Sequence, residues 1–200
     1  MTAAVVLAAG HADRMGSNKL VLPLGPGSVI GWVLEGAAGS ADAVYVVSGL
    51  HDQVTRTAVE QAARGLGASD KVEVVEGVPY DPGMFISVQA GLRRCVGADV
   101  VLVFPGDIPL VSPATAVAVR DAVLHGVADA AVPVHQGRRG HPIAVSGRCI
   151  PELLGMSERA NLRQFLEAHT AKTLLVPVDD AGMLLDMDTP EDYARVRREV

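Results

Sequence analysis

Near its start the chain reads Val5-Val6-Leu7-Ala8-Ala9-Gly10, followed by His11-Ala12-Asp13-Arg14-Met15-Gly16-Ser17-Asn18-Lys19-Leu20. A short apolar run stops at Gly10, and the polar segment after it carries two cations, Arg14 and Lys19, around Gly16. A buried parallel strand that ends in this way delivers backbone N–H groups and positive charge to a phosphate chain. The spacing is neither that of a Walker A loop nor that of a dinucleotide fold. The segment therefore predicts a triphosphate-binding loop, against the alternative of a glycine-rich turn with two solvated cations.

Length and composition favour one large domain spanning residues 1–200. Hydrophobic residues make up 49% and aromatic residues 4% of the chain, a composition typical of parallel sheets covered by helices. The formal net charge of −6 argues against a broad nucleic-acid-binding face. Cys95 and Cys149 stand in unrelated contexts, so we expect reduced thiols rather than a disulfide framework or a zinc site. The first apolar run is too short for a signal peptide or a membrane helix, and we expect a soluble, cytoplasmic protein.

Strand-like and helix-like patterns alternate along the whole chain. The expected strands are 3–8, 43–47, 72–75, 100–104, 130–134, 143–145 and 174–178. The expected helices are 28–38, 52–64, 86–95, 113–125, 151–154, 162–168 and 190–198. This alternation predicts an α/β fold with a doubly wound, mostly parallel sheet flanked by helices. Ligands of such sheets bind beyond the carboxyl ends of the strands, so residues that directly follow strands are the candidates for function.

The first carboxylate of this kind is Asp107, in Pro105-Gly106-Asp107-Ile108-Pro109-Leu110, directly after the expected strand 100–104. Packing explains an acid poorly at the end of so apolar a strand, because buried carboxylates need partners. The alternative, an aspartate that caps the next helix, is weakened by Ser112, which is better placed as the cap. A carboxylate here is typical of a ligand for Mg²⁺, which prefers carboxylate and phosphate oxygens.

The second acidic cluster is Asp186-Met187-Asp188-Thr189-Pro190-Glu191-Asp192. Alternation in an extended segment points Asp186 and Asp188 to the same side. The simpler interpretation is that Asp188 helps to cap the helix that follows and that its acidic neighbours are solvated. The functional interpretation pairs Asp188 with Asp107 around one metal ion.

The motif L-A-A-G-x-x-x-R-M-G-x-x-K-L resembles the signature of the MobA-like nucleotidyltransferases, the family of the molybdenum-cofactor guanylyl- and cytidylyltransferases. P-G-D-I-P-L and D-x-D-T-P-E-D resemble the family's central and closing motifs, in the family's order. The resemblance is strongest to the cofactor cytidylyltransferases and implies a Rossmann-like fold of the nucleotide-diphospho-sugar transferase type. It implies that Arg14, Lys19 and Asp107 are catalytic and that Asp107 and Asp188 hold the metal. The residues that it implies for nucleotide binding are Leu7, Ala8, Ala9, Gly10, Arg14, Gly16, Lys19, Gly83 and Ser87.

Two further segments resemble motifs of the same family. Arg138-Arg139-Gly140-His141-Pro142 resembles its R-G-H-P motif, which implies that Arg139 and His141 bind the acceptor. We expect Gly140 to permit a sharp turn and Pro142 to fix the start of the next strand, and the alternative for His141 is a purely structural role. The segment 83–91 resembles G-[ML]-S-x-S-L-x-A-G. It departs from that motif at Phe85, Ile86 and Gln89, which puts the choice of nucleotide and acceptor in doubt.

The activity implied by the resemblance is Mg²⁺-dependent transfer of a nucleoside monophosphate to the terminal phosphate of a molybdopterin-type cofactor, with release of pyrophosphate. Ala9 favours CTP in this family, and a molybdoenzyme or its chaperone is an implied partner. The alternatives are another phosphorylated acceptor, such as a sugar or polyol phosphate, a nucleotide-binding reductase, or a cofactor carrier without turnover. No nucleic acid or membrane partner is expected. The remaining histidines lack metal-ligand spacing, and we expect them, His169 included, to be surface or capping residues.

Overall fold

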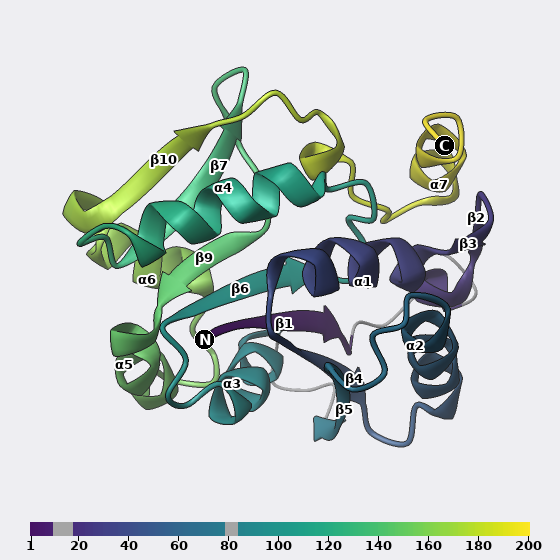
Figure 1. Cartoon of the computed structure of the whole chain (residues 1–200), viewed down its shortest axis with the longest axis horizontal. Helices are drawn as coiled ribbons and strands as arrows, with labels where there is room; N and C mark the ends of the chain where they lie inside the picture. The colour runs from purple at the N-terminus through teal and green to yellow at the C-terminus, as the bar shows by residue number, and fades with distance from the viewer. Residues whose placement is uncertain (10–17, 79–83) are drawn as a thin grey trace.

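A computed structural model of the chain describes residues 1–9, 18–78 and 84–200, without the side chains of residues 76–78 and 84. It confirms the predicted α/β fold, a mostly parallel sheet flanked by helices (Figure 1). In the described part of the chain, no helix combines the length and the apolar character needed to cross a membrane.

The main sheet has the strand order β10-β7-β9-β6-β1-β4-β5, with β8 paired to β7 outside this path. Its strands are β1 (Thr2–Ala8), β4 (Ala43–Gly49), β5 (Val72–Val78), β6 (Val100–Pro105), β7 (Ala130–His135), β8 (Arg138–Arg139), β9 (Ile143–Ser146) and β10 (Thr173–Pro177). The strand β1 lies in the middle, parallel to β4 and β6, with Leu7 opposite Val47 and Pro105. The carboxyl ends of β1 and β6 therefore meet at one edge of the sheet.

Helices cover both faces of the sheet (Figure 1). They are α1 (Val29–Ser40), α2 (Gln53–Gly65), α3 (Met84–Arg94), α4 (Pro113–Leu124), α5 (Ile150–Gly155), α6 (Leu162–Ala168) and α7 (Pro190–Val196). Alternate side chains of β1 enter two separate cores, because successive residues of a strand point to opposite faces. Val6 packs with residues of α1, α2, α4 and α7, and Val5 packs with residues of α3, α5 and α6.

Three features depart from the simple strand–helix alternation. The strand β9 runs antiparallel to both of its neighbours, β6 and β7. A small separate hairpin joins β2 (Pro23–Leu24) to β3 (Gly27–Ser28). The third feature is the hairpin of β7 and β8, whose turn residues Gln136 and Gly137 both have positive φ. This turn corrects the expectation that Gly140 makes the sharp turn, since it lies three residues earlier.

Candidate active site

Three of the residues predicted for the site meet at the carboxyl end of the sheet. The Lys19 Nζ donates hydrogen bonds to Asp107 Oδ2 at 2.7 Å and to Asp188 Oδ1 at 2.9 Å. The exposed fractions of these side chains are 13% for Lys19, 27% for Asp107 and 53% for Asp188. One cation thus lies between two carboxylates, partly shielded on one side and open to solvent on the other. We call these three residues the Lys19 cluster.

Lys19 begins a short 3₁₀ helix, η1 (Lys19–Val21), which the side chain of Asn18 holds in place. The Asn18 side chain accepts a hydrogen bond from the Leu20 N–H and donates one to the hydroxyl of Thr55, a fully buried residue of α2. Leu20 is itself buried in the core. The backbone that carries Lys19 is therefore fixed to α2 and to the core.

Asp107 is placed by the close approach of the ends of β1 and β6. The Gly106 N–H donates a hydrogen bond to the Leu7 carbonyl at 2.9 Å, and a Cβ at position 106 would lie 2.6 Å from that carbonyl oxygen. Only glycine fits such a contact without displacing the backbone. The cap of α4 is Ser112, whose hydroxyl accepts from the Ala114 N–H, so Asp107 is not the helix cap.

Asp188 is held against Asp107 through the backbone. The Met187 N–H donates to the Asp107 carbonyl at 3.1 Å, and the Met187 side chain is fully buried. The helix α7 has its own capping box, formed by Thr189 and Asp192. These contacts correct the simpler interpretation that Asp188 helps to cap this helix, and they leave its carboxylate for Lys19.

The electrostatics of the Lys19 cluster favour a charged ammonium. Burial alone would lower the pKa of Lys19, but the hydrogen bonds and charges of Asp107 and Asp188 outweigh it, and the pKa lies above its ordinary value. The two carboxylates converge on one cation, which is the donor chemistry that suits Mg²⁺. This ion is usually held by one or two carboxylates together with phosphate and water oxygens. Among the described residues no group of three or more histidine, cysteine or acidic side chains could hold a metal. A metal bound by this pair would complete its coordination with oxygens of water or phosphate.

The predicted acceptor residues lie beside this edge of the sheet. Arg139 is exposed on β8, opposite Val134 of β7. His141 follows two residues later, joined to Pro142 by a cis peptide bond, and its buried Nδ1 has no hydrogen-bond partner in the described part of the chain. Burial lowers the pKa of His141 to about 4, against the opposing charge of Asp107. Its imidazole is therefore neutral at pH 7. A Cβ at Gly140 would lie 2.8 Å from the Met183 side chain, so glycine is needed there for packing.

A pocket of about 400 Å³ lies next to these residues. It separates the tip of the β7–β8 hairpin from the segment that leads to α7. Its polar lining includes His135, Arg138, Asp186, Asp192 and Arg195. The volume falls within the range of small-molecule sites, and two guanidinium groups give it donors for phosphate.

The structure explains part of the segment 83–91, which resembles the motif G-[ML]-S-x-S-L-x-A-G. Ser87 lies in α3 and is 5% exposed. Phe85 is buried in the core that the sheet forms with α3, α5 and α6. Gln89 donates hydrogen bonds to the carbonyls of Leu153 and Met156 at the end of α5. Two of the departures from the motif therefore serve packing between α3 and its neighbours. The sequence did not indicate this role.

Some predicted nucleotide-binding residues cannot be placed. Gly10, Arg14, Gly16 and Gly83 lie outside the described residues. Leu7, Ala8 and Ala9 form the end of β1 and the residue after it.

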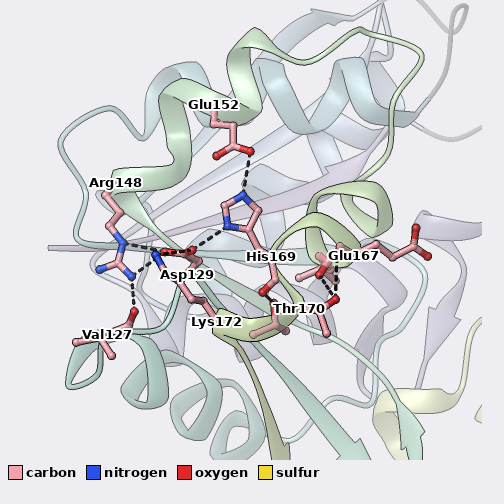
Figure 2. A network of polar contacts seen from close by, with 10 residues as sticks. Val127, Asp129, Arg148, Glu152, Glu167, His169, Thr170 and Lys172 are labelled. Carbon is pink, nitrogen blue, oxygen red and sulfur yellow. Dashed lines mark hydrogen bonds and ion pairs between the residues drawn. The ribbon is translucent and has the colours of Figure 1, made fainter.

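A second ion-pair cluster, which the sequence did not reveal, surrounds Asp129 (Figure 2). One of its carboxylate oxygens accepts from Arg148, and the other lies 2.8 Å from His169 Nδ1. His169 Nε2 lies 2.9 Å from a Glu152 oxygen, and its ring stacks on Phe165. His169 is the C-cap residue of α6, in line with the capping role that we expected, and its side chain also links two carboxylates. We call Asp129, Arg148, Glu152 and His169 the Asp129 cluster.

A larger groove lies elsewhere, between α1 and α2, with a volume of about 1200 Å³. Its lining includes Trp32, Val54 and Leu66 but no residue of the Lys19 cluster. The residues predicted from the sequence for the site therefore lie at the carboxyl ends of the strands and not in this groove.

The chain is similar to several known proteins over nearly its whole length. The molybdenum cofactor cytidylyltransferase of Escherichia coli (strain K12) is 25% identical over 195 residues, covering 94% of this chain and 92% of that protein. The purine catabolism protein PucB of Bacillus subtilis (strain 168) is 30% identical over 199 residues, covering 97% and 95%. A protein of Mycobacterium tuberculosis H37Rv, solved in complex with manganese, is 25% identical with a TM-score of 0.76, covering 100% and 99%.

The family model for the MobA-like NTP transferase domain matches residues 4–173, a range that contains Lys19, Asp107, Arg139 and His141. The match covers most of the chain, from β1 to the start of β10. The chain belongs to the MobA-like NTP transferase domain family.

Proposed function

We propose that this nucleotidyltransferase moves a nucleoside monophosphate, preferably CMP, from an NTP to the terminal phosphate of a molybdopterin-type cofactor and releases pyrophosphate. The observation that carries the proposal is the Lys19 cluster, in which one ammonium and two carboxylates converge at the carboxyl ends of β1 and β6. Phosphoryl chemistry asks a protein mainly for positioning and for neutralisation of charge. This cluster supplies both kinds of charge that the reaction needs.

Asp107 and Asp188 are the residues that would hold Mg²⁺. When bound with the nucleotide, the metal supplies charge neutralisation and Lewis acidity at the α-phosphate. Lys19 would offset the negative charge of the β- and γ-phosphates and of the departing pyrophosphate, and Arg14 is assigned the same task from the sequence. The preference for Mg²⁺ is part of the proposal.

The acceptor is proposed to bind on the side of Arg139 and His141. A terminal phosphate is already ionised at neutral pH, so the attack needs no general base. The neutral imidazole of His141 suits a hydrogen-bonding role better than one as a cation. The pocket lined by Arg138 and Arg195 is proposed to hold the rest of a phosphorylated acceptor. The preference for CTP rests on Ala9 and on the resemblance to the cytidylyltransferases.

The experiment is an assay of pyrophosphate release with Mg²⁺, each of the four NTPs in turn, and molybdopterin cofactor as acceptor. Reactions without acceptor, and with a sugar phosphate or a polyol phosphate, serve as controls. Release with CTP and molybdopterin supports the proposal in full. Release only with another acceptor contradicts the assigned substrate. No release under any condition contradicts transfer and leaves a reductase or a carrier as the alternatives.

A further inference from the structure

The position of Lys19 has a consequence for metal binding. Its Nζ lies 2.7 Å and 2.9 Å from one oxygen of each carboxylate that the proposed function assigns to Mg²⁺. An ammonium held at these distances repels a divalent cation that coordinates to the same two carboxylates at about 2.0–2.1 Å. We propose that Lys19 is an internal cation that competes with the divalent metal for Asp107 and Asp188, and that it is displaced when the metal binds.

The surroundings of the Lys19 cluster make such an exchange feasible. The Asp188 side chain is 53% exposed, so one side of the cluster is open to an incoming ion. The backbone of Lys19 is fixed by Asn18, so only the flexible side chain has to move. A displaced ammonium would remain beside the metal, in reach of the phosphates that accompany it. The inference rests on the proposed function, because it assigns the same two carboxylates to the metal.

The first test measures Mn²⁺ binding without nucleotide, by isothermal titration calorimetry or by the loss of the free-ion signal in electron paramagnetic resonance. Lys19→Met removes the competing charge at similar size. It should tighten Mn²⁺ binding by about tenfold, about 1.4 kcal/mol, because the metal no longer has to displace a cation from the two carboxylates. Lys71→Met is the matched control, since it changes net charge equally at an exposed lysine in the turn before β5. The control should leave the affinity unchanged.

The second test uses the wild-type chain, so it does not depend on the folding of a variant. The lysines of the chain are Lys19, Lys71 and Lys172, and mass spectrometry can follow the acetylation of each amine separately. Adding Mg²⁺ alone should accelerate acetylation of Lys19 several-fold, because the displaced amine loses its two carboxylate partners. The other two lysines serve as internal references and should not respond.

The inference is overturned if Lys19→Met leaves the Mn²⁺ affinity unchanged or weakens it, or if neither protein binds Mn²⁺ at millimolar concentration. An acetylation rate at Lys19 that does not respond to Mg²⁺ also overturns it. The proposed function can fail separately. If Lys19→Met binds Mn²⁺ more tightly but the wild type releases no pyrophosphate, the competition is supported and the proposed reaction is contradicted. If the wild type releases pyrophosphate but Lys19→Met binds Mn²⁺ with unchanged affinity, only the competition is contradicted.

Discussion

Two ion-pair clusters lie at opposite ends of the strands of the same sheet, with different arrangements of charge. In the Lys19 cluster one cation lies between two carboxylates, after the carboxyl ends of β1 and β6. In the Asp129 cluster the carboxylate of Asp129 contacts Arg148 and His169, and His169 also contacts Glu152 (Figure 2). Asp129 lies directly before β7, which runs parallel to β6 because both are antiparallel to β9. The Asp129 side chain is 6% exposed, whereas that of Asp188 is 53% exposed. The buried Asp129 carboxylate is suited to holding elements together, and the exposed Asp188 carboxylate to exchanging its partner with a ligand.

The largest expected effect is on turnover. Asp188→Asn should lower pyrophosphate release by about 1,000-fold, as expected when charge that stabilises the reacting phosphates is removed. The unfolding temperature should stay near that of the wild type, because the capping box of α7 does not involve Asp188. Asp70→Asn, at an exposed aspartate in the turn before β5, is the matched control and should keep normal turnover. Equal losses in the two variants would remove Asp188 from the site.

The Asp129 cluster should respond in stability instead. Asp129→Ala leaves the charges of Arg148 and His169 without their shared partner, and it should lower the free energy of unfolding by about 3 kcal/mol. Chemical denaturation measures this change, with exposed Asp70→Ala as the control. Turnover per folded molecule should be unchanged at a temperature where the variant is folded. A large loss of turnover in the folded variant would contradict the separation between the two clusters.

Gly106 tests the backbone that connects the sheet to the Lys19 cluster. Gly106→Ala places a Cβ 2.6 Å from the Leu7 carbonyl oxygen and should cost about 2 kcal/mol of stability, as overpacking does elsewhere. The shift also displaces Asp107, so turnover should fall. Gly39→Ala in α1 meets no atom within 4 Å and should be neutral or slightly stabilising. The same denaturation and turnover assays report both variants, and a Gly106→Ala protein with wild-type stability would refute the close contact.

The smallest effect concerns pH. Hydrogen bonds and charge from Glu152, and then from Asp129, raise the pKa of His169 above 6.5. Its stabilisation is therefore complete below pH 6.5 and is lost as pH rises through the raised pKa of the folded state. The pKa of Asp129 is lowered to about 2, chiefly by His169, so its contribution is present above pH 3.8 and is lost as pH falls toward 2.

His169→Gln should therefore be less stable than the wild type by about 1.5 kcal/mol near pH 6, with the difference shrinking as pH rises. Denaturation curves across this pH range measure the difference. Glu152→Gln removes the largest cause of the raised pKa, so its loss of stability with rising pH should be smaller and should end at a lower pH than in the wild type. A difference between wild type and His169→Gln that does not change with pH would show that the imidazole does not titrate in this range.

The architecture and part of the Lys19 cluster could be predicted because both depend on where residues stand relative to the strands. Lys19 and Asp107 come after strands whose apolar runs are plain in the sequence, and parallel strands bring their carboxyl ends to one edge. Asp188 is 169 residues from Lys19 along the chain, yet its place in a motif before α7 identified it. The roles of these residues in catalysis stay predictions.

The Asp129 cluster could not be predicted because no periodicity brings its members together. Asp129 and Glu152 lie 40 and 17 residues from His169 along the chain. Asp129 belongs to the connection before β7 and Glu152 to α5, and neither position shows more in the sequence than an ordinary turn or helix residue. The role of Gln89 was missed for the same reason, since its partners are backbone carbonyls of a distant helix. A lone histidine or glutamine carries no signal of contacts that only the tertiary fold creates.

The most direct test of the account compares Asp107→Asn with Asp129→Asn in the same two assays, pyrophosphate release and chemical denaturation. The account predicts opposite outcomes. Asp107→Asn should lose nearly all turnover while unfolding like the wild type, and Asp129→Asn should unfold more easily while its folded molecules turn over normally. An Asp107→Asn protein that is folded and fully active would contradict the assignment of the Lys19 cluster as the reaction centre.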